Sequence, residues 1–327
     1  MIPDATIIIP CIEINSLTIK CVETCSRLCP DSEIIIVADF SADPGIFSHL
    51  SETRIITSGP TTIAAKRNMA AAQSNADFLA FIDSDAYPEE NWVTNAIKLL
   101  GQNPELGAIG GPNLPPPVQS LSERYVGQSL RSPLVSGKWT YRKTIRPARI
   151  VNDLPSCNLI VRKGVYQSLN GMDEALFTGE DMEFCSRVVK AGSKILYTPK
   201  VLVYHKNRGL KSFFLQRITY GASVFELMRR GFNLNFLLLF LPAGFVLFIM
   251  TIPMALIWAP WFWVYCGILS LYSIGIVVES FRHSAKSSDI PGTMAALAIG
   301  NIAPGLGTIA KVLGILPNLK SIYKNND

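Results

Sequence analysis

The sequence predicts an α/β domain with a mostly parallel sheet, followed by a C-terminal part embedded in a membrane. Before Gly231, short apolar runs alternate with segments of helix length, a pattern typical of parallel sheets covered by helices. From Gly231 to Val278 no residue is charged, and a second charge-free stretch runs from Ile290 to Ala310. Since about 20 apolar residues cross a bilayer, the first stretch is long enough for two passes.

Local patterns place the elements of the N-terminal part. Asn15 is a suitable N-cap for a helix to about Leu28, and Thr61 or Thr62 begins a second helix to about Ser74. Apolar, β-branched runs predict buried strands at 5–10, 33–37, 54–57 and 78–82.

The fourth predicted strand ends in Asp83-Ser84-Asp85. Ligands of open α/β sheets lie beyond the carboxyl ends of the strands. Two carboxylates there suit a divalent metal, which in turn holds phosphates. The alternative is a solvated acidic corner without a ligand. No Gly-x-Gly-x-x-Gly follows the first strand, so a dinucleotide-type phosphate loop is not supported.

The net charge, the N-terminal residues and the cysteines indicate which binding partners and which cell compartment to expect. The net charge is +5, and its basic residues cluster before the charge-free stretch, which favours phospholipid over nucleic acid. The N-terminus lacks the basic start and apolar core of a signal peptide, so we expect a cytoplasmic domain. The seven cysteines are odd in number and lack metal-ligand spacing. We interpret Cys21, Cys25 and Cys29, spaced every four residues, as buried hydrophobes, with a metal or redox role as the alternative.

An ordered set of motifs makes the assignment more specific. They are Pro10 after the first strand, Asp39 after the second, Arg67-Asn68 in a helix, Asp83-Ser84-Asp85, then the segments 155–162, 171–174 (Gly-Met-Asp-Glu) and 178–184 with Gly179-Glu180-Asp181. Together they resemble family 2 glycosyltransferases of the GT-A fold, a Rossmann-like, mostly parallel mixed sheet. The resemblance covers about residues 5–230 and points to the membrane-anchored type that builds exopolysaccharides or surface glycans.

The resemblance implies an inverting, metal-dependent transfer from a nucleotide sugar. It implies a base, Asp181, with Glu180 beside it, and a Mn²⁺ or Mg²⁺ site at Asp83, Asp85 and His205. The donor-binding residues it implies are Pro10, Glu13, Asp39, Arg67, Asn68 and Asp83.

Elementary chemistry agrees with these roles and leaves alternatives open. A carboxylate such as Asp181 can take the acceptor's proton, or cap the helix that follows. The Arg67 guanidinium suits phosphate, or lies on a solvated helix face. We expect one strand over 195–204, and His205 follows it. The His205 imidazole suits Mn²⁺ better than Mg²⁺, and the alternative is a histidine of the core or the surface.

The chain departs from the family pattern where base and ribose should bind. Ala38 replaces the first of two usual aspartates, Phe40 replaces a small residue, and Ile12-Glu13 displaces an asparagine. The sequence therefore leaves the donor open among UDP-, GDP- and dTDP-sugars.

The stretch 112–153 is expected to be a long irregular loop, with basic residues at 142, 143, 146 and 149. It is a lid for phosphates, a contact for anionic lipid, or a solvated loop.

The membrane part follows a basic segment, so that side is expected to be cytoplasmic. We predict a catalytic domain at 1–210, an interfacial amphipathic helix at 211–232 and a membrane domain at 233–327. Gln216, Arg217 and Tyr220 are candidate acceptor or interface residues on that helix. Spans are expected at about 235–258 and 261–278, and 290–316 is either a third span or a re-entrant helix pair. Gly300, Gly305 and Gly307 would allow close helix packing.

We therefore expect a multi-pass protein of the cell membrane that transfers a sugar to a lipid-linked or glycan acceptor. A close alternative is transfer to a polyprenyl phosphate itself. An alternative of another class is a non-catalytic membrane scaffold. A transporter is disfavoured because the charge-free stretches hold no ionisable substrate or ion site.

Overall fold

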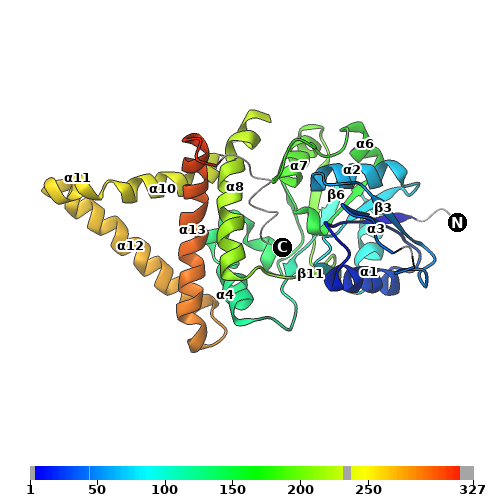
Figure 1. Ribbon diagram of the computed structural model, residues 1–327, viewed down its shortest axis with the longest axis horizontal. Helices are drawn as coiled ribbons and strands as arrows, with labels where there is room; N and C mark the ends of the chain where they lie inside the picture. Colours follow the sequence, from blue (N-terminus) through cyan, green and yellow to red (C-terminus); the bar gives the residue numbers. More distant parts are fainter. Residues whose placement is uncertain (1–3, 44, 231–236, 317–327) are drawn as a thin grey trace. The chain divides into compact units, whose positions relative to one another are not determined.

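The computed structural model describes residues 4–43, 45–230 and 237–316 (Figure 1). The chain forms two compact units. The first contains Met1–Pro116 and Tyr141–Lys206, and the second contains Pro117–Thr140 and Asn207–Asp327. The domain limits 1–210, 211–232 and 233–327 stay a prediction. The compact units differ from them in assigning 117–140 to the second unit.

The first unit is built on an eight-stranded sheet in the order β3-β2-β1-β4-β9-β6-β10-β8. β9 runs antiparallel to both of its neighbours and β8 runs antiparallel to β10, while the remaining pairs are parallel. This confirms a mostly parallel mixed sheet. Its strands are β1 (Ala5–Pro10), β2 (Glu33–Ala38), β3 (Thr53–Thr57), β4 (Phe78–Phe81), β6 (Leu106–Gly110), β8 (Arg149–Val151), β9 (Leu159–Arg162) and β10 (Lys194–Tyr197).

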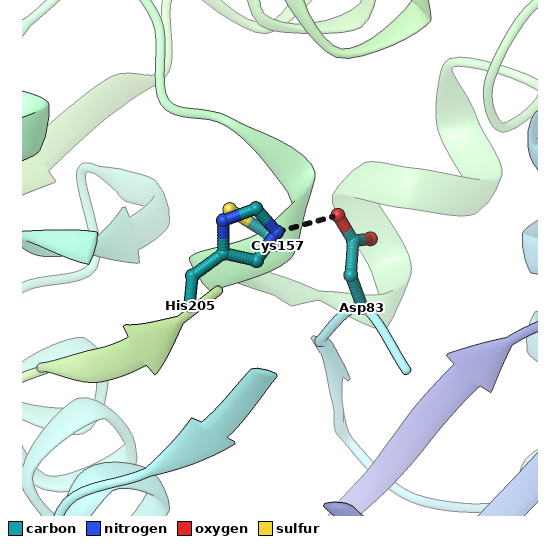
Figure 2. Close-up of side chains that lie close together, drawn as sticks. All are labelled: Asp83, Cys157 and His205. Carbon is teal, nitrogen blue, oxygen red and sulfur yellow. Dashed lines mark ion pairs between the residues drawn. The ribbon is translucent and has the colours of Figure 1, made fainter. Parts of the chain in front are cut away.

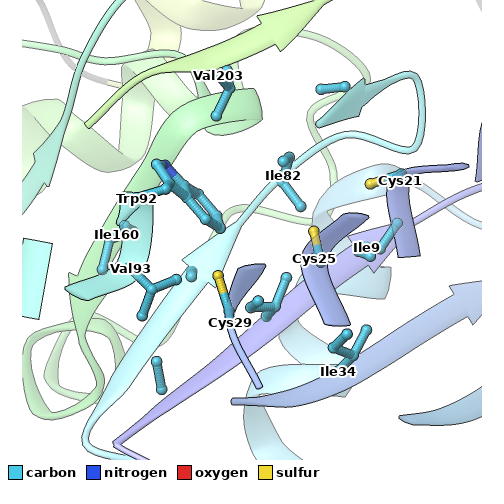
Figure 3. Close-up of a cluster of buried hydrophobic side chains, with 14 of the residues drawn as sticks. Ile9, Cys21, Cys25, Cys29, Ile34, Ile82, Trp92, Val93, Ile160 and Val203 are labelled. Carbon is cyan, nitrogen blue, oxygen red and sulfur yellow. The ribbon is translucent and has the colours of Figure 1, made fainter. Parts of the chain in front are cut away.

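One core lies between this sheet and two helices, α1 (Ser16–Leu28) and α3 (Trp92–Gln102). Alternate residues of β1 and β2 enter it because side chains of a strand point to opposite faces in turn. Cys21, Cys25 and Cys29 lie in this core beside Ile9 and Ile34 (Figure 3). Their interpretation as buried hydrophobes is confirmed. The predicted cap of α1 is also present, since Asn15 Oδ1 accepts from the N–H of Leu17 and Thr18.

The remaining helices of the first unit are short. α2 (Ile63–Gln73) begins after Thr62, whose hydroxyl accepts from the N–H of Ala65. The others are α6 (Lys163–Ser168), the one-turn helix η2 (Ser156–Asn158) and α7 (Glu180–Lys190), while η1 (Gly137–Lys143) lies where the chain passes from the second unit to the first.

A second, three-stranded sheet contains β5 (Ala86–Pro88), β11 (Val203–His205) and β7 (Asn113–Leu114) in the order β5-β11-β7. The prediction of one strand over 195–204 was therefore wrong. The run divides into β10 and β11, which belong to different sheets. Pro199 lies in the break, and proline has no N–H to continue a ladder. The N–H of Val201 instead closes a turn on the carbonyl of Thr198.

Among its described residues, the second unit has three helical segments that are, by length and composition, able to cross a membrane: Leu238–Ile257, Ala259–His283 and Ser287–Val312. They overlap the predicted spans, of which 235–236 lie outside the described residues, and the crossing of a membrane stays a prediction. The third segment is dominated by one continuous helix, α13 (Ile290–Val312), so a re-entrant pair was wrong. The other elements are α4 (Leu121–Leu130), α5 (Pro133–Ser136), α8 (Leu210–Arg230), η3 (Leu238–Phe240), α10 (Leu241–Met250), α11 (Ile252–Ile257), α12 (Ala259–His283) and η4 (Ser287–Asp289).

α13 packs closely on its neighbours at the three predicted glycines, which confirms that expectation. α8 and α13 run side by side (Figure 1). A Cβ at Gly307 would collide with the carbonyl of Ile218 in α8, and one at Gly305 with that of Pro242 in α10. A Cβ at Gly300 would meet the side chain of Val135 in α5. Small residues let helix backbones approach this closely.

The stretch 112–153 is not the irregular loop expected. It contains α4, α5, η1 and β8, and α4 begins with a capping box formed by Ser120 and Glu123. Arg124 of α4 makes a two-pronged ion pair with Asp289, at 2.9 and 2.6 Å. The apolar face of α4 packs on α13 around Val126 and Ala296. Burial against distant helices therefore orders a segment that looks loop-like in sequence.

Candidate active site

Neighbouring parallel strands bring the predicted donor-side residues to one edge of the main sheet. β1 lies between β2 and β4. Pro10, Asp39 and Asp83 lie at or just beyond the carboxyl ends of these three strands. Pro10 is buried, whereas Glu13 is exposed in the loop that follows it. The N–H of Asp39 donates to the carbonyl of Ile12, which ties the two loops together.

His205 reaches the carboxylates because β5 pairs with β11. Asp83 and Asp85 directly precede β5, and His205 is opposite Ala86 in the antiparallel register. The His205 Nε2 lies 3.2 Å from an Asp85 carboxylate oxygen. It also lies 3.7 Å from Asp83 Oδ2, the ion pair drawn in Figure 2. The three predicted metal ligands are thus brought together.

Cys157 joins this cluster and was missed as a site residue. Ligand atoms of Asp83, Cys157 and His205 all lie within 4.8 Å of one another. Cys157 is in η2, which leads into β9, the strand paired with β4. Burial, and next the charge of Asp83, raise the pKa of its thiol well above its usual range. The sequence signal was weak, because one cysteine far from other ligands has no diagnostic spacing.

The residues present fit a divalent cation. Carboxylate oxygens are hard ligands suited to Mg²⁺ and Mn²⁺, and an imidazole adds affinity for Mn²⁺. The carboxylates of Asp83 and Asp85 are about one-third exposed, at 34% and 35%, which leaves them open on one side. Within the described residues, the His205 Nδ1 is buried without a hydrogen-bond partner.

Arg67 is deeply buried and connects two carboxylates. Its side chain is 2% exposed, and its two terminal nitrogens contact Asp83 at 2.8 Å and Glu180 at 2.7 Å. Burial lowers the pKa of Arg67, but Asp83, Glu180 and Asp181 more than compensate, so its pKa is raised and its charge is held. These contacts favour a positioning role, and direct phosphate binding by Arg67 stays a prediction.

Glu180 and Asp181 begin α7. Burial and the charge of Asp181 raise the pKa of Glu180, against the lowering effect of Arg67. Asp181 Oδ1 accepts from the N–H of Met182, and Oδ2 accepts from the N–H of Ser156 at 3.2 Å. Asp181 therefore contacts both the first turn of its own helix and the segment that carries Cys157. Its role as base stays a prediction.

Lys66 is a second buried cation that the sequence did not single out. Its side chain is 1% exposed, and its Nζ lies 2.5 Å from Asp39 Oδ1 and donates to the carbonyl of Cys11. Lys66 fixes the carboxylate proposed to contact the donor. A lysine beside an arginine on a helix looks like a solvated face, so only the tertiary structure reveals its position.

Asn68 holds another segment in place. Its Oδ1 accepts from Tyr166 and from the N–H of Met172, and its Nδ2 donates to Glu174 and the carbonyl of Met172. Both ends of the amide are thus engaged by the 166–174 region. A direct donor contact by Asn68 stays a prediction.

Two basic residues of the 112–153 stretch, Arg142 and Arg149, have partners within the first unit. Arg142 pairs with Asp153 at 2.5 Å, and Tyr141 donates to the same carboxylate. Arg149 stacks on the Tyr141 ring, with 4.6 Å between the guanidinium carbon and the ring centroid. Burial lowers the pKa of Arg142, but the charges of Asp153, Tyr141 and Asp181 more than compensate, so its pKa is raised and its charge is held.

The predicted acceptor residues lie in the second unit, on α8. Gln216 donates to the Tyr220 hydroxyl at 3.2 Å, and Tyr220 is 43% exposed. The Arg217 guanidinium lies over the ring of Phe213 at 5.0 Å. An acceptor role for these residues stays a prediction.

Comparison with known proteins gives a consistent family. The model of glycosyl transferase family 2 matches residues 6–169. The pre-mycofactocin glycosyltransferase of Mycobacterium tuberculosis is 31% identical over 176 residues, which are 51% of this chain and 35% of that protein. The chain therefore spans about a third of the length of that relative.

Two further proteins extend the likeness. One is a dolichyl N-acetyl-alpha-D-glucosaminyl phosphate 3-beta-D-2,3-diacetamido-2,3-dideoxy-beta-D-glucuronosyltransferase of Methanococcus voltae, 24% identical over 68% of this chain and 66% of that protein. The other is the solved structure of the mannosyltransferase PcManGT from Pyrobaculum calidifontis in complex with GDP-Man and Mn²⁺. It aligns with a TM-score of 0.51 and 15% identity over 98% of this chain and 82% of that one, which shows a shared GT-A fold.

Proposed function

Because the chain belongs to glycosyl transferase family 2, we propose that it is an inverting, metal-dependent glycosyltransferase that uses a nucleotide-sugar donor. The acceptor is a lipid-linked sugar or a growing polysaccharide at the cytoplasmic face of the membrane. The observation that carries the proposal is the Arg67 guanidinium, which contacts Asp83 and Glu180 together. It links the candidate cation site to Glu180, the neighbour of the candidate base Asp181.

The leaving group requires charge neutralisation. A divalent cation held by Asp83, Asp85 and His205 would supply it as a Lewis acid. Arg67 keeps the Asp83 carboxylate oriented, with one oxygen engaged and the other facing His205. Lys66 fixes Asp39 for the donor base in the same way. The chain's own residues thus form a rigid donor side before any ligand arrives.

The acceptor requires a base opposite the leaving group, because inversion is a single displacement. Asp181 takes the proton of the acceptor hydroxyl. The N–H groups of Met182 and Ser156 hold its carboxylate in place. Burial and the charge of Asp181 raise the pKa of its neighbour Glu180.

The membrane helices support a lipid-linked acceptor. A soluble acceptor would not require candidate spans, and the Methanococcus relative is named for a dolichyl-phosphate-linked substrate. Basic residues at 206, 208 and 211 and at 282 and 286 flank the apolar segments. By the positive-inside rule these flanks are cytoplasmic, as a nucleotide-sugar donor requires.

The test is transfer by the purified full chain in detergent, with Mn²⁺ and a panel of radiolabelled UDP-, GDP- and dTDP-sugars. Polyprenyl phosphate and polyprenyl-linked sugars serve as acceptors. We expect one donor to label a polyprenyl-linked sugar, and Asp181→Asn to abolish the labelling. Labelling of polyprenyl phosphate alone would favour the alternative acceptor. No transfer with any donor, together with no nucleotide binding, would favour a scaffold.

A further inference from the structure

The candidate cation site contains a thiol that the proposed reaction does not use. Asp83 lies in the loop after β4, Cys157 in η2 and His205 in β11, and the three side chains point toward one another (Figure 2). Cys157 is 5% exposed, so the thiol belongs to the interior of the site. His205 is shared by two possible ligand sets. One set adds the oxygens of Asp83 and Asp85, and the other adds Asp83 and the Cys157 sulfur.

The two ligand sets suit different cations. Oxygen-rich sets favour Mg²⁺ and Mn²⁺ with six ligands, whereas Zn²⁺ prefers four ligands that include sulfur and nitrogen. Sulfur, imidazole and carboxylate within 4.8 Å of one another are three of the four ligands of a tetrahedral site. Water or a donor phosphate would complete it.

The surroundings of Cys157 make the thiol a cation-dependent ligand. Coordination displaces the thiol proton to water, because a bound cation deprotonates a ligating thiol. The Asn113 amide donates to the sulfur at 3.0 Å, which stabilises the thiolate once it has formed.

We propose that Asp83, Cys157 and His205 form a binding site for a thiophilic divalent cation such as Zn²⁺, with Cys157 bound as the thiolate. This inference rests on the proposed function in sharing Asp83 and His205 with the proposed Mn²⁺ site. Zn²⁺ at this site competes with Mn²⁺ and draws the shared ligands away from Asp85. The enzyme is therefore sensitive to zinc.

Cobalt gives a direct optical test, because Co²⁺ replaces Zn²⁺ and shows a thiolate-to-metal band in the near ultraviolet. We expect this band in the wild-type protein and its loss in Cys157→Ala. The matched control is Cys185→Ala, which removes another buried thiol outside the cluster and should retain the band. Absence of the band from wild type that still takes up Co²⁺ would overturn the proposal.

Calorimetry separates this inference from the proposed function. We expect Cys157→Ala to bind Zn²⁺ about tenfold or more weakly than wild type and to lose more affinity for Zn²⁺ than for Mn²⁺, while Cys185→Ala binds Zn²⁺ as wild type does. Equal Zn²⁺ affinity in both proteins would refute the thiol site and leave the glycosyltransferase proposal intact. Failure of the glycosyltransferase proposal would instead appear as no nucleotide binding, with the cobalt band still present.

Discussion

Arg67→Met removes the buried cation that joins Asp83 to Glu180, and it should destabilise the first unit in a pH-dependent way. Loss of one partner of a buried ion pair costs about 3–5 kcal/mol. The Asp83 side chain is 34% exposed and keeps water, so its share is only about 0–1 kcal/mol. Glu180, at 12% exposed, carries most of the cost. It can limit that cost by taking up a proton.

The sign of the pH dependence follows from Glu180. Burial and Asp181 raise its folded-state pKa from 4.5 to about 7. An acid whose pKa is higher in the folded than in the unfolded state stabilises the fold at low pH. This stabilisation is lost as pH rises through the folded-state pKa. Arg67→Met removes the cation that lowers this pKa. The variant therefore continues to lose stability at pH values where the stability of the wild type has become constant. The variant's deficit should therefore grow as pH rises above about 7.

We expect a deficit of about 2–3 kcal/mol near pH 8, which corresponds to a Tm lower by about 5–10 °C. The assay is thermal unfolding of the detergent-purified chain, followed by circular dichroism from pH 6 to pH 9. In a Glu180→Gln background the same substitution should lose its pH dependence. Arg54→Met is the control, because Arg54 is 40% exposed and pairs at the surface with Glu33, where about 0–1 kcal/mol is expected.

A deficit that stays constant or shrinks from pH 6 to pH 9 would refute this reasoning. It would mean that Arg67 does not hold the Glu180 carboxylate. A deficit equal to that of Arg54→Met would lead to the same conclusion.

Three further predictions concern separate parts of the chain. Asp181→Asn should lower kcat by about 10²–10⁴-fold with little change in nucleotide affinity; a parallel loss of both would contradict its role as base. Gly221→Ala should lower the Tm, because its Cβ would meet the Pro304 carbonyl, whereas Gly244→Ala, with open space around it, should not. Equal effects would contradict close packing of α8 on α13. Asp289→Ala should destabilise the second unit by about 1–3 kcal/mol, because it leaves the Arg124 guanidinium and the Gln128 amide without their acceptor; an unchanged unfolding midpoint would contradict this.

Most of the fold could be predicted from local patterns. β1, β2 and β4 follow from short apolar runs, and α1 begins at its predicted cap. Asp83 and Asp85 were identified because acidic residues followed a buried strand. The convergence of His205 on them was expected from the family resemblance, and the pairing of β5 with β11 explains it physically.

The remainder depends on contacts between distant residues, which leave no local signal. Lys66 looks like a surface lysine, yet it is buried against Asp39. Cys157 becomes a site residue only because η2 leads into the strand beside β4. α4 looked like a loop because the residues that order it, such as Asp289, are more than 150 positions away.

Nucleotide binding tests the central claim most directly. Calorimetry with UDP, GDP, dTDP and CMP, with and without Mn²⁺, would be done on wild type and Asp85→Ala. We expect one nucleoside diphosphate to bind only when both Mn²⁺ and Asp85 are present. Binding that needs neither, or no binding of any nucleotide, would contradict a metal-dependent glycosyltransferase site at Asp83, Asp85 and His205.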